Sequence, residues 1–194
     1  DYDFTFYPLD EGNPIIIRTN YSVSGGDGGL GQVRYVNACT LLAPHIAKAD
    51  ISPELLTDNL SRSFYYSPDC TDKSTAATVV DKDFIPRHST SASVAIEGVN
   101  SPDSVGDMVM WTLMGYPPCG VTQPVTLRNI PADLLPDTTG GCKASRDAQT
   151  LKDGVFFRRR GTWRIKMPEL QRISNENKSK SLINYRKFRT GNNK

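Results

Sequence analysis

Basic side chains crowd the C-terminal part of the sequence, and their chemistry is that of phosphate binding. Residues 143–194 contain fifteen Lys and Arg against four acidic residues, a net charge of +11, whereas residues 1–142 carry −9. Cations that replace the counterions condensed on a polyanion release those ions, which drives binding. The charge distribution therefore predicts a nucleic-acid partner. The expected binding residues are Arg158, Arg159, Arg160, Arg164, Lys166, Arg172, Lys178, Lys180, Arg186, Lys187 and Arg189.

Other partners fit the same basic residues, which could face an acidic protein or a membrane surface, or only keep the chain soluble. Among nucleic acids we expect RNA ahead of DNA. Tyr185 and Phe188 lie between the cations, and aromatic rings among cations suit base stacking on single strands. The same two rings suit a hydrophobic anchor for the C-terminal segment equally well.

Catalytic and cofactor motifs are weak. The run Gly26–Gly31 matches GxGxxG, but the residues from Gln32 onward favour a strand, and the dinucleotide site requires a helix there. His88 and Ser89 could be base and nucleophile, but neighbouring side chains on a strand point to opposite faces. We therefore expect no enzyme, no catalytic residue and no cofactor.

The cysteines and histidines give no metal motif. Only His45 and His88 could complete a zinc site, so no metal is expected. The cysteines are too far apart for a CxxC motif, and they could be free thiols or form disulfides in any of three full pairings. They are Cys39, Cys70, Cys119 and Cys142.

Secretion is an alternative that rests on Asn20, Asn59 and Asn177, because each begins an N-glycosylation pattern. That pattern is short and is met by chance in a chain rich in Asn, Ser and Thr. No apolar run approaches the roughly 20 residues that a membrane-spanning helix needs, so no span is expected.

The elements that must position these residues are predicted to be strands. Short runs rich in β-branched and aromatic residues alternate with turn residues, which predicts an all-β fold, a two-sheet antiparallel, jelly-roll-like sandwich. One or two short helices, at 52–60 and 129–136, and a basic C-terminal extension complete it. The expected strands are 14–23, 32–43, 62–67, 76–85, 91–99, 107–116, 124–130 and 154–167.

Two of these strands alternate in a way that assigns their faces. In the last one, the apolar row that begins at Trp163 is expected in the core, and the basic row that begins at Arg164 is expected outside. In the strand at 91–99, Val94 and Ile96 are expected to form the buried row.

These patterns divide the chain into a β-sandwich domain, residues 1–167, and a basic C-terminal arm or tail, residues 168–194. The tail could be a docked helix, an extended arm or a mobile segment, and we expect its deletion to leave a folded domain that binds nucleic acid weakly. The function expected is that of a self-assembling, homo-oligomeric coat protein in a virion, whose basic segment binds the packaged genome. Alternatives are an RNA-binding component of a ribonucleoprotein, or a secreted disulfide-bonded lectin, toxin or surface glycoprotein.

Overall fold

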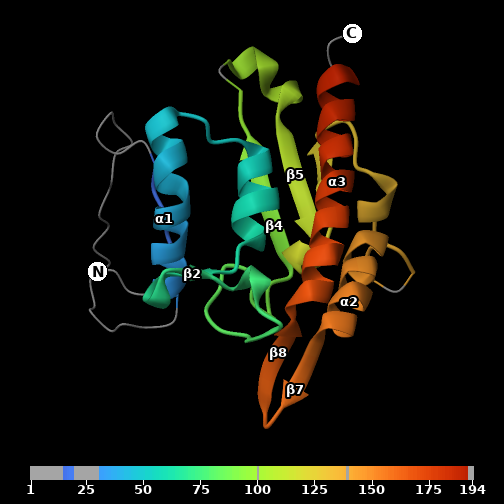
Figure 1. Ribbon diagram of the computed structural model, residues 1–194. Coiled ribbons are helices and arrows are strands. Elements are labelled where there is room, and N and C mark those ends of the chain that lie inside the picture. The colour runs from blue at the N-terminus through green and yellow to red at the C-terminus, as the bar shows by residue number, and fades with distance from the viewer. Residues whose placement is uncertain (1–14, 20–30, 100, 139, 192–194) are drawn as a thin grey trace, which may run out of the picture.

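The computed structural model of the protein describes residues 15–19, 31–99, 101–138 and 140–191, and it has a mixed fold with long helices (Figure 1). In these ranges the strands pair antiparallel and form three small sheets of two or three strands. The prediction of an all-β, jelly-roll-like sandwich is therefore wrong. The α-helices are α1 (Gln32–Lys48), α2 (Lys143–Val155) and α3 (Met167–Gly191).

The central sheet has the strand order β4-β5-β6, and α3 covers one of its faces (Figure 1). Trp111 on this inner face is fully buried, and its ring centroid lies 4.4 Å from that of Tyr185 on the helix. Phe188 makes an edge contact with the same indole, at 5.3 Å. These aromatic contacts hold α3 against the sheet. The strands are β4 (Ala92–Glu97), β5 (Val109–Met114) and β6 (Gln123–Thr126).

A second sheet, with the order β3-β8-β7, contains a hairpin that extends beyond the body of the molecule (Figure 1). The base of the hairpin belongs to the main hydrophobic core, in which Ile165 packs with Phe64, Phe84 and Tyr116. The hairpin is thus anchored at one end and free at the other. Its strands and their neighbour are β3 (Thr78–Val80), β7 (Phe156–Arg159) and β8 (Thr162–Lys166).

Short helical turns and a two-stranded sheet connect these parts. The residues predicted as a short helix at 52–60 form mainly a π-helix, η1, followed by a 3-10 turn, η2, and the turn predicted within 129–136 is η7. Both predictions of short helices are confirmed. The elements are η1 (Leu55–Asn59), η2 (Leu60–Arg62), β1 (Tyr65–Tyr66), η3 (Ser67–Asp69), β2 (Thr71–Asp72), η4 (Lys73–Thr75), η5 (Pro102–Asp107), η6 (Pro117–Cys119) and η7 (Ala132–Leu134).

The strand predicted at 32–43 is instead the helix α1. Its β-branched and aromatic residues favour a strand when each is considered alone, but propensity is a weak guide that tertiary contacts override. Leu42 is buried, and the buried Asn37 accepts a hydrogen bond from the Ser67 backbone at 2.9 Å, which ties α1 to η3. Residues 15–19 form no strand, and the rest of the strand predicted at 14–23 lies outside the described residues.

The strand predicted at 91–99 exists as β4, but its faces are the reverse of those predicted. Ala95 is 5% exposed, whereas Val94 is 49% and Ile96 is 66% exposed. The buried side is the one that α3 covers, and Ala95 shares it with its cross-strand partner Trp111. Alternation shows that a strand has two faces, but the helix that packs on it decides which one is buried.

The remaining predicted strands each contain or overlap an observed one, although the observed strands are shorter. The run 154–167 contains the two strands of the hairpin, and Met167 is the first residue of α3. The matches are β1 in 62–67, β3 in 76–85, β5 in 107–116, and β7 with β8 in 154–167, whereas β6 begins one residue before the predicted run 124–130 and overlaps it.

Of the three forms considered for the C-terminal segment, the docked helix is confirmed. Met167, Leu170 and Ile173 of α3 belong to the main core, and Tyr185 belongs to the smaller cluster around Trp111. Because α3 contributes to both clusters, we now expect deletion of residues 168–194 to unfold the chain.

Candidate nucleic-acid interface

The hairpin β7–β8 places three consecutive arginines at its free end. Arg158 lies opposite Trp163 and Arg159 opposite Thr162, so the turn consists of Arg160 and Gly161. Both turn residues have positive φ, 51° and 79°, which is the requirement of a type I′ turn. That turn matches the right-handed twist of the two strands, and the glycine in it adopts its conformation without strain.

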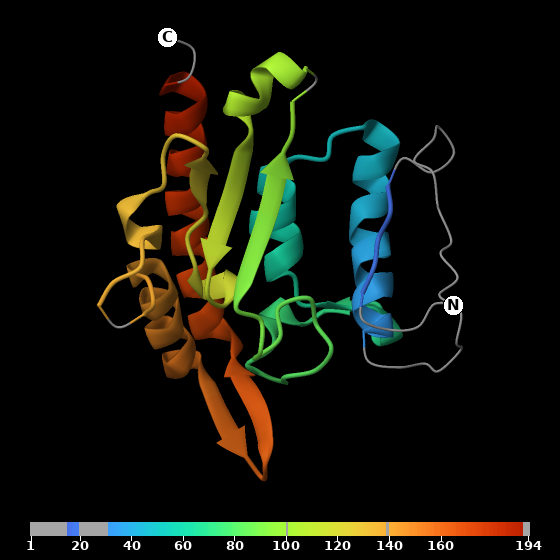
Figure 2. The same cartoon turned by 180° about the vertical axis from the view of Figure 1, so that it is seen from behind.

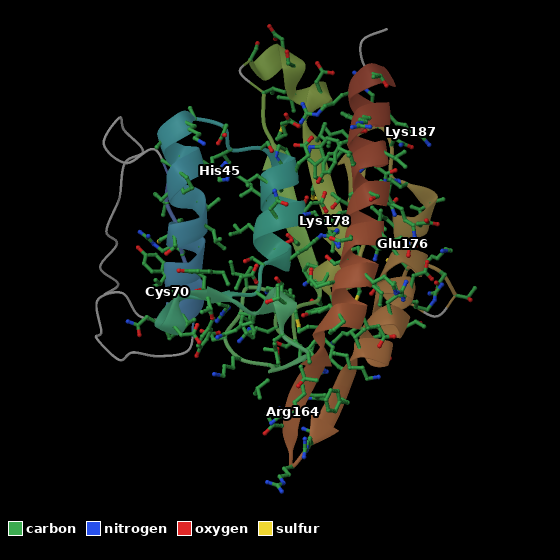
Figure 3. The ribbon with its side chains drawn as sticks, viewed as in Figure 1. His45, Cys70, Arg164, Glu176, Lys178 and Lys187 are labelled. Carbon is green, nitrogen blue, oxygen red and sulfur yellow. The ribbon has the colours of Figure 1, made fainter. Side chains whose placement is uncertain are left out.

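The faces of β8 are those that the sequence predicts. Ile165 and Met167 are fully buried and Trp163 is half-buried, whereas Lys166 is exposed. Figure 3 shows Arg164 on the projecting hairpin. The buried row fixes the hairpin to the core, and the basic row is left on the opposite side.

No carboxylate among the described residues forms an ion pair with the hairpin arginines. Arg158, Arg159 and Arg160 are exposed. The ion pairs found in the described residues involve cations other than these arginines. Arg164 is half-buried, and its Nε has no hydrogen-bond partner. The hairpin therefore carries a local excess of positive charge that the fold does not neutralise.

An aromatic cluster supports the first of these arginines. The guanidinium carbon of Arg158 lies 5.0 Å from the centroid of the Trp163 ring, a cation–π contact. The His88 ring stacks on the same indole, with centroids 4.2 Å apart and planes 17° apart, and Phe156 contacts His88 edge-on at 5.0 Å. The indole is occupied by protein groups, so it serves as a support for Arg158.

The His88 ring has an unusual electrostatic environment. Burial lowers its pKa, and the positive charges of Lys152 and Arg158 lower it further, although Asp153 acts in the opposite direction. Because the ordinary pKa of histidine is about 6.5, the ring is neutral at pH 7. Neutral His88 can lie beside two cations without repelling them.

The basic residues of α3 differ because the fold neutralises several of them. Arg172 and Lys180 share Glu176, at 3.8 and 2.7 Å, and Arg189 lies 3.3 Å from Glu54. Figure 3 shows Glu176 on the side of α3 that faces away from the sheet. The hydrogen bond from Lys180 lowers the pKa of Glu176. These pairs leave less free positive charge on the helix than its composition indicates.

Of the other cations of α3, together with Lys166 just before the helix, two have a polar partner and two form no ion pair within the described residues. Lys178 donates to the Asn59 side chain at 2.8 Å, and its pKa is lowered by burial and by the charge of Arg62. Lys166 lies 4.0 Å from Glu169. Arg186 and Lys187 are exposed and form no ion pair with the described residues.

The aromatic residues of α3 are anchors and do not form a stacking platform. Tyr185 is 2% exposed, and its hydroxyl shares a short hydrogen bond with Thr57. Burial raises the pKa of Tyr185 to about 12. Phe188 packs against Trp111. Of the two interpretations of these rings, the hydrophobic anchor is the one that the contacts support.

Three other sequence motifs have structural roles or lie outside the described residues. A helix does follow Gly31, contrary to the prediction, but the Gly31 amide donates to the Asp83 carboxylate at 2.8 Å. The remaining residues of the glycine motif lie outside the described part. All four cysteines are free thiols. Asn177 is 3% exposed and donates to the Cys119 carbonyl oxygen, a position that leaves no room for a glycan, whereas Asn59 is exposed.

Sequence reasoning missed the residues beneath the hairpin. From the sequence, His88 is considered as a catalytic base and as a zinc ligand, and Lys152 is counted only as a charge. In the structure the Lys152 ammonium lies 5.8 Å from the Phe156 ring, and burial lowers its pKa. The signal that could have found Lys152 is the spacing Ala148–Lys152–Val155, which places one buried stripe on α2. No sequence pattern indicates the contact of His88 with Trp163, which lie far apart in the chain.

Comparisons of the chain with protein-family models, with curated proteins and with solved structures gave no match. No helix in the described residues is both long and apolar enough to cross a membrane. No group of three or more His, Cys, Asp or Glu side chains in those residues is placed to hold a metal ion.

Proposed function

We propose that the protein binds nucleic acid through the β7–β8 hairpin, with backbone phosphates as the ligand groups. The observation that carries the proposal is the set of four hairpin arginines, 158–160 and 164, which form no ion pair with a carboxylate of the described residues. Arg binds phosphate through a planar fork of donors, and release of counterions supplies the free energy.

Binding through the hairpin should depend little on base sequence. Trp163 is already in contact with His88 and Arg158, and Tyr185 is buried, so these rings are not available to stack on bases. Phosphate contacts position a protein on nucleic acid and carry no sequence information. RNA remains the first ligand to test, with duplex DNA as the second, because a two-stranded ribbon also fits the major groove of B-form DNA.

The decisive experiment replaces Arg158, Arg159 and Arg160 together by Ala. Fluorescence anisotropy with a labelled single-stranded RNA, over a salt series from about 50 mM to about 200 mM, gives the affinity and its salt slope. We expect the affinity at low salt to fall at least about tenfold, and the slope to decrease by about two to three, one contact per arginine.

A matched variant with Lys at the same three positions keeps the charge and removes the guanidinium fork. We expect it to retain the salt slope and lose only part of the affinity. Two RNAs of equal length and different sequence should bind the wild-type protein equally. A wild-type affinity that does not change with salt would refute the proposal.

The coat-protein hypothesis adds self-assembly to nucleic-acid binding. It no longer has the support of a jelly roll, but the segregation of charge still favours it, and the surface described below is the observation that favours self-association. Electron microscopy of the purified material tests it, because a coat protein forms closed particles or filaments. A ribonucleoprotein component would show neither, and nuclease-treated protein would be a small species in light scattering.

A further inference from the structure

No helix of the described residues covers the outer face of the central sheet in Figure 2, and the side chains along its β4 edge are exposed, although Thr112 on the middle strand is only 6% exposed. The outer face is defined as the side of the sheet opposite to α3. By strand register it consists of Ala92, Val94 and Ile96 of β4, Met110, Thr112 and Met114 of β5, and Gln123 and Val125 of β6. Figure 2 shows the sheet from this side, and α3 lies behind it.

The outer face departs from the usual pattern of a sheet that is covered on one side only. Such sheets alternate apolar side chains toward the core with polar ones toward water. Here Ile96 is 66%, Val94 is 49% and Met110 is 36% exposed. Ile96 lies directly opposite Met110 in the register, so the exposed aliphatic groups are adjacent. Contiguous exposed apolar groups mark interaction surfaces.

The charge of the outer face restricts what can cover it. None of its eight residues is charged, in a chain of which 23% is Asp, Glu, Lys or Arg. A nucleic acid or a charged protein surface would lose its hydration against these side chains and gain no opposite charge. The partner must therefore present an uncharged, apolar surface of its own.

A second copy of the chain meets this requirement. In a two-fold dimer the same patch meets itself, and a patch without charge has no like-charge repulsion to overcome. In the edge strand β4, Glu97 is the first charged residue, and by register it lies on the α3 side of the sheet with Ala95, so this edge places no charge on the outer face.

We infer that two copies pack the outer faces of their central sheets against each other, with Ile96 and Met110 at the centre of the contact. Sheets that pack in this way lie about 10 Å apart and interdigitate their side chains. Both α3 and the hairpin stay outside the interface, since α3 covers the other face of the sheet (Figure 1). The dimer would present two sets of hairpin arginines to one polyanion, which raises its apparent affinity.

The test is sedimentation equilibrium of nuclease-treated full-length protein at high salt, from about 1 µM to about 100 µM, the range of moderate dimer affinities. We expect a reversible dimer for the wild type. Ile96→Lys places an unpaired charge in the interface and should raise the dimer Kd at least about tenfold. Ile96 is largely exposed in one copy, so the variant should fold, and circular dichroism verifies this.

Val36→Lys is the matched control, because Val36 is also β-branched and is 40% exposed, but it belongs to α1 and is not one of the outer-face residues. It should dimerise as the wild type does. A monomeric wild type, or a dimer that both variants weaken equally, would overturn the inference. A monomeric wild type that is destabilised by Ile96→Lys would also overturn it, because that result would mean that another part of the same chain covers the outer face. The alanine variant of Arg158, Arg159 and Arg160 should still dimerise, so failure of the dimer and failure of RNA binding are separate results.

Discussion

The hairpin β7–β8 and the helix α3 are both rich in basic residues, but the fold treats their charges differently. The hairpin projects from the body of the molecule (Figure 1), and its arginines form no ion pair within the described residues. On α3, Glu176 is shared by Arg172 and Lys180, and the apolar side of the helix carries two hydrophobic clusters. Formal charge alone does not identify a binding surface, because charge that is already paired releases fewer counterions.

The largest difference between the two regions should appear in stability. Tyr185→Ala removes a buried ring that contacts Trp111, and we expect a loss of about 3–5 kcal/mol in the free energy of unfolding. The alanine variant of Arg158, Arg159 and Arg160 should lose less than about 1 kcal/mol, because exposed side chains contribute little. Urea unfolding followed by circular dichroism measures both. Equal losses would contradict the division of roles.

The next largest difference should appear in nucleic-acid binding. Replacing Arg172, Lys180 and Arg189 by Ala removes as much charge as the hairpin variant does, but from side chains that already have acidic partners. We expect the salt slope to change by less than half of the change in the hairpin variant, about one unit or less. Anisotropy with the same RNA tests this, and equal changes would show that location does not matter.

A smaller effect should follow when α3 is released from its own acid. Glu176→Gln removes the carboxylate that Arg172 and Lys180 share, so both cations become available. Exposed ion pairs are weak, so we expect RNA affinity at low salt to rise only about two- to fivefold. Glu169→Gln is the control, because Glu169 lies near a single cation, Lys166, at 4.0 Å. A decrease in affinity for Glu176→Gln would refute the neutralisation argument.

The smallest effect should be the pH dependence that His88 gives to stability. Its pKa is lower in the folded state than in the unfolded state, so the unfolded chain binds the proton more readily. The contribution of neutral His88 to the free energy of unfolding is complete above about pH 6.5, and it is lost as the pH falls through the lower pKa of the folded state. His88→Phe keeps a ring against Trp163 but cannot titrate. Its urea midpoint should therefore fall less between pH 7 and pH 5 than that of the wild type.

The faces of β8 could be predicted from the sequence because their signals are local. The apolar residues from Trp163 onward alternate with basic ones, so the two faces follow from neighbouring residues. The single strand expected over 154–167 is instead divided into β7 and β8 by the turn at Arg160 and Gly161. The candidate arginines could be named from the same segment.

The fold class could not be predicted because it depends on contacts that are distant in the chain. The residues of α1 favour a strand individually, and α2 has only a short buried stripe. The buried side of β4 was assigned wrongly because Tyr185, about ninety residues later in the chain, packs on the opposite side. Pairing of α3 cations with Glu54 and Glu176 likewise required knowledge of which helix face is exposed.

The left-handed backbone at Arg160 has a consequence for engineering. A non-glycine residue with positive φ costs about 1 kcal/mol or more, and Asn or Gly would occupy this turn position with less strain. Arg160→Gly should therefore make the loop easier to form while it removes one guanidinium from the tip. Arg160 therefore adds a third positive charge to the tip but destabilises the turn. Selection for thermostability alone would favour its replacement by Gly, and would remove one of the arginines that we expect to bind RNA.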